Sequence, residues 1–432
     1  MKKGMIAKIV IAAGIVLFLA SGYMGYRYSM AVNAREQSVK EINAHLNEYI
    51  PSPFENSAMS QTAPPPKKQD EVLYSYQATG SLVFLSHSEE WNEEKLKNLY
   101  EELLKNKHGK EIETLHEVTV FPEEEETALA AHASDVVKQG LEIKFGALPS
   151  NFKIDFMRDV SLIYLYDGDA NNTIESMAWS LSHEYGHLYT FYYFLKKDIY
   201  NFGKTEYGKL RKYEEYDLIT DHLPDANYDK NHHRYLFETA AEDYVQLMGS
   251  PTTRKVVDFP DVREIINGIE IPEDKEYETG YNARPQENYK IPLAREVKGL
   301  AEYFYSFIDE KPPIPKEERK EVKLSIQSGS RGYNLAEGYR DFIYYTLEWN
   351  TPYKDATYTL VCYDSQEDQL AIIKTVDKLE DAVATIGTLS YESRGYVHYQ
   401  YDSLDTGTKT FLVMIQLPDG TYYSSEPLTH TF

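Results

Sequence analysis

The sequence predicts an α+β domain followed by an all-β sandwich domain, with a transmembrane helix at the N-terminus. Residues 9–26 form an uncharged run. Strand and helix patterns then alternate up to residue 167, and a helical region follows to about residue 309. After residue 320 the periodicity changes to two, which is typical of half-buried strands. A chain of 432 residues is also too long for one ordinary core, so two or more domains are expected.

The N-terminus predicts a signal-anchor over residues 1–28. Lys2, Lys3 and Lys8 precede an apolar run that is at the short end of what spans a bilayer as a helix. A signal peptide cleaved near residues 20–22 is the alternative, but no A-x-A site follows the run. With an uncleaved anchor the chain is a single-pass protein of the cell membrane with its body outside, and with cleavage it is secreted.

Two proline-rich stretches divide the rest of the chain. Residues 29–70 read as a juxtamembrane region that ends in a semi-rigid Pro-rich linker, and residues 310–320 read as a second linker. The body is therefore expected to consist of a domain at 71–309 and a domain at 321–432.

The first domain should begin with alternating elements. Helices are expected at 93–107 and 123–138, the second because an acidic run suits a helix N-terminus. Strands are expected at 80–86, 116–121, 141–145 and 160–166.

The second domain should contain seven or eight short strands. They are expected at 322–326, 341–349, 357–363, 370–375, 383–389, 396–401, 410–417 and 421–424. This spacing predicts a β-sandwich. The stretch 345–363, with Trp349, Pro352 and Tyr358, is similar in a generic way to the early strands of fibronectin type III or immunoglobulin-like modules.

Charge and cysteine content exclude several classes of function. The formal net charge of -24 argues against sequence-independent binding of nucleic acid, which needs a basic surface. Cys362 is the single cysteine, so an intrachain disulfide and a cysteine-ligated zinc site are both impossible. Its place in an alternating pattern predicts a buried core thiol.

The segment that carries chemistry is Ser176–Tyr189, which contains the sequence HEYGH. On a helix His183 and His187 are one turn apart on the same face, so both imidazoles can reach one metal ion. Glu184 stands at the edge of the apolar stripe, where a partly desolvated carboxylate can act as a general base. Asn172 and Glu175 look like the capping box that starts this helix. The alternative is a helix whose two histidines and glutamate make ordinary surface contacts.

A catalytic zinc site needs a third protein ligand and an open position for water. The extended metzincin pattern would need glycine and histidine where this chain has Thr190 and Tyr193, so the metzincin class is excluded. The next acidic helix, at 234–248, places Glu238 and Glu242 four residues apart on one face, and a solvated helix face is the alternative reading of this pair.

A zinc-binding HExxH followed about fifty residues later by a glutamate in an ExxxE helix resembles the gluzincin clan of zinc peptidases. The string ETAAEDYVQLMGS looks most like the lethal-factor-like catalytic domain. The likeness covers residues 160–250 and implies a zincin fold with one Zn²⁺ ion. By this resemblance Glu238 is the third ligand, and Glu242 orients a ligand histidine through its far nitrogen. A swap of the two roles stays open.

The resemblance also implies a group that stabilises the oxyanion and a strand that pairs with substrate. The corresponding position is Asn231, with His232, His233 and Tyr235 as close candidates. The strand expected at 160–166 precedes the active helix and is the candidate for pairing with an extended peptide, although an inner strand would show the same alternation.

Together these patterns predict a membrane-anchored extracytoplasmic zinc endopeptidase. Its partners would be a protein or peptide substrate, the membrane, and a surface partner of the C-terminal sandwich, with no nucleic acid. Two alternatives remain: an inactive binding module that kept a zincin fold, and a structural zinc protein whose fourth ligand would be His232 or His233.

Overall fold

A computed structural model of the chain describes residues 71–123, 130–134, 160–195, 202–220, 231–255, 263–266, 269–272, 284–315, 317–335, 338–364, 370–376, 382–387, 389–393, 396–400 and 407–432. The anchor expected at 1–28, the juxtamembrane region at 29–70 and the strand expected at 141–145 lie outside these residues. Within the described ranges, no helix combines the length and apolar character that crossing a membrane requires.

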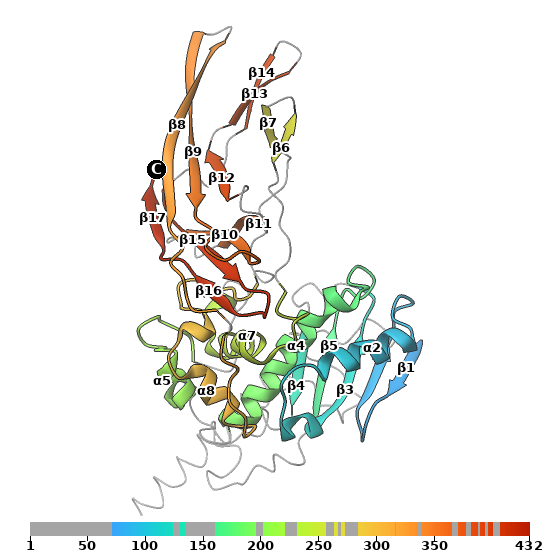
Figure 1. Ribbon diagram of the computed structural model, residues 1–432. Helices are drawn as coiled ribbons and strands as arrows, with labels where there is room; N and C mark the ends of the chain where they lie inside the picture. Colours follow the sequence, from blue (N-terminus) through green and yellow to red (C-terminus); the bar gives the residue numbers. More distant parts are fainter. Residues whose placement is uncertain are drawn as a thin grey trace, which may run out of the picture.

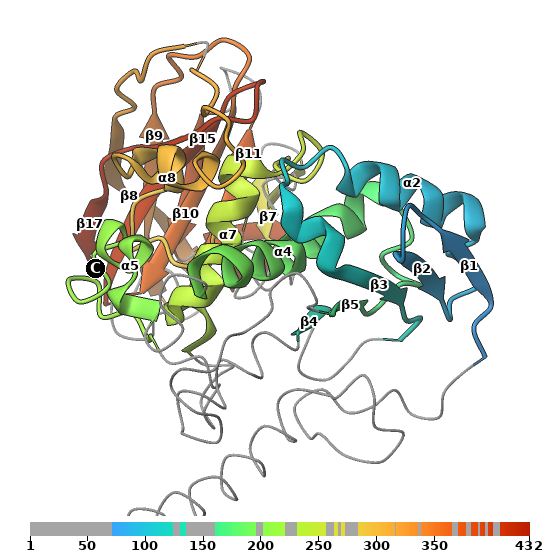
Figure 2. The same cartoon turned by 90° about the horizontal axis from the view of Figure 1, so that it is seen from below.

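A five-stranded sheet forms one layer of the N-terminal part (Figures 1 and 2). Its strands, in spatial order, are β1 (Tyr74–Gln77), β2 (Val83–Ser86), β3 (Leu115–Val120), β5 (Ser161–Leu165) and β4 (Ala130–Ser134). The three central strands are parallel, and each edge strand runs antiparallel to its neighbour.

Two of the sequence predictions for this sheet need correction. Residues 130–134 form β4, where a helix over 123–138 was expected, because they pair along their whole length with β5. β5 in turn lies between β3 and β4, so among the described strands it is not an edge that could receive a peptide.

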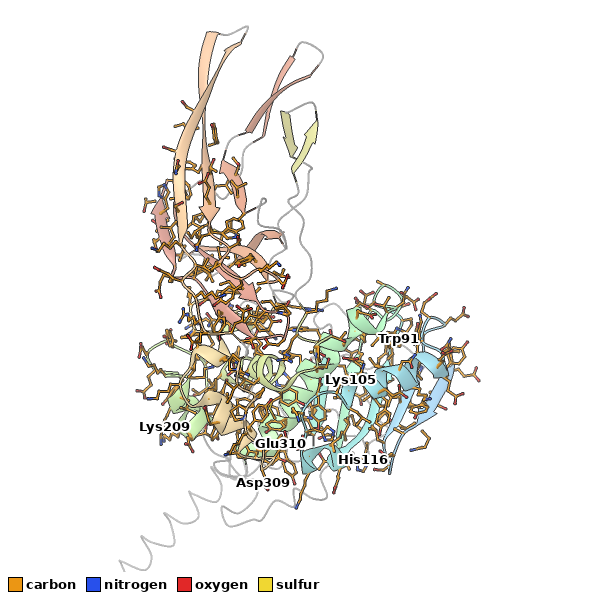
Figure 3. The ribbon with its side chains drawn as sticks, in the orientation of Figure 1. Trp91, Lys105, His116, Lys209, Asp309 and Glu310 are labelled. Carbon is orange, nitrogen blue, oxygen red and sulfur yellow. The ribbon has the colours of Figure 1, made fainter. Side chains whose placement is uncertain are left out.

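Helices α2 (Glu93–Leu103) and α4 (Ile174–Thr190) pack on the sheet and against each other. Asn92 caps α2 by accepting a hydrogen bond from the amide of Lys95 at 3.0 Å, and four apolar side chains of α2 are buried. Trp91, labelled in Figure 3, is fully buried and donates its indole N–H to the carbonyl of Gly168 at 2.9 Å. This bond fixes the loop that leads from β5 into α4.

The helical region after α4 contains α5 (Glu206–Leu210), α7 (Leu236–Met248) and α8 (Leu300–Tyr305). The sequence predicted that this whole region is helical, and the structure shows that this prediction is wrong for part of it. β6 (Arg263–Ile266) and β7 (Ile269–Pro272) are strands that pair with each other in antiparallel register.

The C-terminal part is rich in strands, as predicted. They are β8 (Leu324–Leu335), β9 (Gly338–Trp349), β10 (Thr357–Asp364), β11 (Leu370–Val376), β12 (Val383–Gly387), β13 (Leu389–Ser393), β14 (Tyr396–Gln400), β15 (Thr408–Gln416), β16 (Tyr422–Ser424) and β17 (Leu428–Thr431). β8 and β9 form the long orange hairpin of Figure 1 and extend further than the sequence indicated, and β17 was not expected.

Two sheets of this part enclose one core. β12, β9 and β8 make one sheet, and β11, β10, β15 and β16 make the other, with β17 paired to β15. Buried side chains from both sheets, among them Leu347, Leu360 and Ile415, belong to a single cluster. Cys362 is buried in this cluster, which confirms the prediction of a core thiol.

Candidate metal centre

The helix that carries the HExxH sequence starts one residue later than expected. Thr173 is the N-cap, and it forms a reciprocal capping box with Ser176 rather than the predicted pair of Asn172 and Glu175. The Thr173 hydroxyl accepts from the Ser176 amide at 3.1 Å, and the Ser176 hydroxyl accepts from the Thr173 amide at 3.3 Å. The start of α4, and with it the direction of its histidines, is fixed by local sequence.

α4 and α7 approach closely beside the histidines. A Cβ on Gly186 would lie 2.9 Å from the carbonyl oxygen of Ala241 and 3.0 Å from its Cα. Neither backbone atom can move aside as a flexible side chain could, so Gly186 is needed for this approach. Ala240 and Ala241 of α7 are fully buried, and their small side chains allow this approach.

This approach brings Glu238 of α7 to both histidines of α4. Glu238 Oε2 lies 3.0 Å from His183 Nε2 and 3.2 Å from His187 Nε2. Ligand atoms bound tetrahedrally to zinc at about 2.0–2.1 Å are roughly 3.3 Å apart, so the observed spacing fits a zinc site. All three side chains are nearly inaccessible to solvent. The structure therefore brings together the three predicted ligands.

Glu184 is buried beside this centre. A carboxylate oxygen of Glu184 and one ring nitrogen each of His183 and His187 lie within 4.8 Å of one another. Burial raises the pKa of Glu184 to about 7, with a further upward contribution from Glu238 and an opposing one from His183. A carboxyl group with a pKa near neutrality is suited to general-base catalysis.

Aromatic rings also pack on the two α4 imidazoles, whose Nε2 atoms face Glu238. His183 Nδ1 and His187 Nδ1 are buried and have no hydrogen-bond partner among the described residues. The indole of Trp179 stacks on the His183 ring at 5.1 Å, and Phe191 and Phe237 pack on the His187 ring at 5.7 and 5.8 Å.

Glu242 does not make the hydrogen bond expected of it. Its Oε1 accepts from the backbone amide of Glu287 at 2.6 Å instead of bonding to a histidine of α4. Burial, and then the nearby Glu287 carboxylate, raise the pKa of Glu242 well above its usual range. Its observed role is to hold residue 287 against α7.

His232 is the candidate oxyanion group with a ring nitrogen beside the proposed ligands. Its Nε2 lies 3.4 Å from Glu238 Oε2, and its Nδ1 lies 2.7 Å from Glu287 Oε2. Burial would lower the pKa of His232, but Glu287 and Glu238 raise it to about 10. A divalent cation on Glu238 would offset part of that carboxylate's effect. The Nε2 of His232 therefore lies beside the proposed ligand Glu238, and its Nδ1 contacts Glu287.

The other candidates lie around this position. Asn231 precedes the short 3₁₀ helix of His232–Arg234, and Tyr235 is buried in the core against Phe237. Burial lowers the pKa of His233 to about 4, with Lys290 and Arg234 acting in the same direction.

Sequence reasoning missed two side chains near the centre. Glu287 comes from a segment without motif or periodicity, so no local pattern marks it. His132 lies on β4, where a helix was expected, and its ring packs on Phe191 at 6.0 Å. Burial lowers the pKa of His132 to about 3, and His187 adds to this effect, so His132 stays neutral at physiological pH.

No family model matches the chain, and no curated protein is significantly similar to it.

Proposed function

We propose that the protein is a zinc-dependent endopeptidase related in its catalytic site to gluzincins of the lethal-factor-like type. The observation that carries this proposal is the convergence of three side chains on one point: Glu238 Oε2 lies 3.0 Å from His183 Nε2 and 3.2 Å from His187 Nε2. Two neutral imidazoles and one carboxylate are a common ligand set of catalytic zinc.

The roles of the residues follow from their positions. His183, His187 and Glu238 would hold the ion, and bound zinc supplies the Lewis acid that acidifies a water molecule and polarises a scissile carbonyl. Glu184 accepts a proton from the attacking water and delivers it to the leaving amine, so that water is added across the C–N bond. His232 donates a hydrogen bond to the oxygen on which negative charge develops.

The proposal is tested with the full-length chain and its Glu184→Gln variant. Both should bind one zinc ion per chain, because Glu184 is not a proposed ligand. The wild type should cleave internal bonds in a peptide library, whereas the variant should lose several orders of magnitude in rate because the base is missing. A variant that retains more than about a tenth of the wild-type rate would show that Glu184 is not the base.

A structural zinc site with four protein ligands is a second candidate, and the position of His232 favours it. The carboxylate of Glu287 on Nδ1 resembles the support that zinc-bound histidines usually receive. His232→Ala distinguishes the two functions. In the endopeptidase this variant keeps its zinc and loses hydrolysis, whereas in a closed structural site it loses the zinc.

The proposed location is the outer face of a membrane. It depends on the lysines and the uncharged run at residues 9–26. The C-terminal two-sheet part is proposed to bind a surface partner or to position substrate, by analogy with fibronectin type III and immunoglobulin-like modules.

A further inference from the structure

Residues 284–296, called the strap here, pass between α7 and the C-terminal sheet. The side chain of Gln246 in α7 binds the strap at two points. Its Nε2 donates to Gln286 Oε1 at 3.1 Å, and its Oε1 accepts from the backbone amide of Ala294 at 2.9 Å. Between these points the backbone amide of Glu287 donates to Glu242. The strap is therefore fastened along one side of α7.

The opposite side of the strap is built into the C-terminal part. Tyr289 and Leu293 belong to one buried cluster with four side chains of the second sheet, namely Val361, Leu412, Met414 and Tyr422. The Tyr289 hydroxyl lies 3.5 Å from Met414 Sδ and donates to the carbonyl of Arg284 at 2.8 Å. Figure 1 shows this sheet, at β15 and β16, directly above α7.

A polar contact strengthens the same connection. The Glu296 carboxylate accepts hydrogen bonds from the backbone amide of Ser424 at 2.9 Å and from the Ser424 hydroxyl at 2.8 Å. These bonds attach the strap to the end of β16. Arg319 lies 3.3 Å from the same carboxylate. The strap cannot shift without disturbing both α7 and the sheet.

We propose that the C-terminal part helps to position residues of the catalytic site. Through the strap it sets the position of Glu287, and Glu287 is a positioning residue that holds His232 beside Glu238. This inference rests on the proposed peptidase function. Its physical basis is the short chain distance between Tyr289, which is anchored in the sheet cluster, and Glu287, whose carboxylate contacts His232 at 2.7 Å.

Adjacent residues of β15 provide a matched pair of variants. Met414 faces the strap, whereas Ile415 faces the core between the two sheets. Met414→Ala and Ile415→Ala remove the same number of non-hydrogen atoms from buried positions. Both should destabilise the C-terminal part, but only Met414→Ala should loosen the strap.

The first measurement is peptide hydrolysis by full-length chains at a temperature where both variants are folded. Met414→Ala should lower kcat by about 10- to 100-fold, as displaced catalytic groups do, with KM little changed and one zinc ion per chain retained. Ile415→Ala should stay within about twofold of the wild type, since Ile415 belongs to the core between the two sheets and shares no cluster with the strap. Equal losses in both variants would show a general effect of stability and overturn the proposal.

The role of Glu287 is tested by Glu287→Gln and Glu287→Asp. Glu287→Gln should lower kcat rather than raise KM, and Glu287→Asp should recover part of the loss because it restores a carboxylate. In the double variant with Met414→Ala the two losses should be less than additive, since both act on His232. Fully additive losses, or no difference between the Gln and Asp variants, would contradict the role.

Hydrogen exchange provides a measurement that does not depend on catalysis. In Met414→Ala, amides of residues 284–296 and 231–235 should exchange faster than in Ile415→Ala and the wild type. Unchanged exchange would overturn the strap connection even if hydrolysis is present. If the wild type cleaves no peptide but this exchange pattern is found, the proposed activity fails while the connection between the sheet and His232 stands.

Discussion

Glu238 and Glu242 are one helical turn apart, yet the structure gives them different partners. Glu238 faces two imidazoles of α4, while Glu242 faces the backbone of the strap. Glu238→Gln should therefore abolish stoichiometric zinc binding, because a neutral amide is a poor replacement for a carboxylate ligand. Glu242→Gln should keep the zinc, since its oxygen can still accept from Glu287. Metal analysis of both purified variants measures the difference.

The reverse result would contradict this assignment of the two glutamates. If Glu242→Gln lost its zinc and Glu238→Gln kept it, the two roles would be exchanged. If both variants stayed fully loaded, α7 would not contribute to the site.

The pKa of Glu184 predicts a pH dependence of stability in the metal-free protein. Below its ordinary value of 4.5 the carboxyl is protonated in both the folded and the unfolded chain. Between 4.5 and about 7 the unfolded chain loses this proton while the folded chain keeps it, so rising pH lowers the free energy of unfolding. Because one pKa unit corresponds to 1.36 kcal/mol, the loss between about pH 5 and about pH 8 is roughly 2–3 kcal/mol.

Glu184→Gln provides the comparison, since it lacks the titrating group. After removal of metal with a chelator, the wild type should lose more stability than the variant over this pH range, as measured by urea unfolding. Parallel pH profiles would show that Glu184 is not desolvated in the metal-free protein.

Local spacing identifies some of these residues and not others. His183, Glu184 and His187 lie within two turns of one helix, so their geometry follows from helical periodicity alone. Glu238 could be found because its own helix carries a recognisable pattern. Glu287 could not, because it meets His232 across 55 residues of chain, and only tertiary packing creates that contact.

The close packing of α4 against α7 brings the three proposed ligands together. Gly→Ala within a helix normally adds about 1 kcal/mol of stability. Gly186→Ala should do the opposite and destabilise by about 1–3 kcal/mol, because the new Cβ would meet the backbone of Ala241. Zinc affinity should fall as well, since moving α7 away withdraws Glu238. Thermal unfolding and zinc titration measure both effects.

Ser180→Ala is a suitable control, because it changes the partly exposed side of the same helix. It should leave zinc affinity unchanged. A Gly186→Ala variant that is as stable and as metal-loaded as Ser180→Ala would show that the helices have room to adjust.

Arg211, which directly follows α5, connects α5 to α7 and to the strap. Its guanidinium pairs with Asp243 of α7 and donates to the carbonyl of Pro292 in the strap at 2.6 Å. Arg211→Met should cost about 3–5 kcal/mol of stability, because Asp243 is left buried without its counter-charge. The double change Arg211→Met with Asp243→Leu should recover much of this loss. Urea unfolding of both would show whether charge compensation or packing dominates at this junction.

At the element level, periodicity predicted α2, α4, α7 and most C-terminal strands, since the apolar residues of each element recur at the period of a helix or a strand. It failed at β4, where the preceding acidic residues favour a helix and the strand is defined only by its pairing with β5. It failed again at β6 and β7, which are only four residues long each and are defined by their pairing with each other.

For the whole molecule, the charge pattern of the N-terminus predicts the orientation. A protease added to intact cells should digest the body from about residue 71 onward, because the lysines before residue 9 should stay in the cytoplasm. A cytoplasmic marker protein serves as the control for cell integrity. Complete protection of the body would mean that it lies inside the cell.

The strap also bears on how the two parts can change over evolutionary time. A domain attached to its neighbour only through a linker such as residues 310–320 can be exchanged by recombination without consequence for that neighbour. Here the linker follows the segment that carries both Glu287 and Tyr289, so a new C-terminal part would have to reproduce the surface around Met414. Substitutions at Tyr289 and Met414 should therefore be correlated among related chains, and an exchange at the linker should preserve the three proposed ligands while disturbing His232.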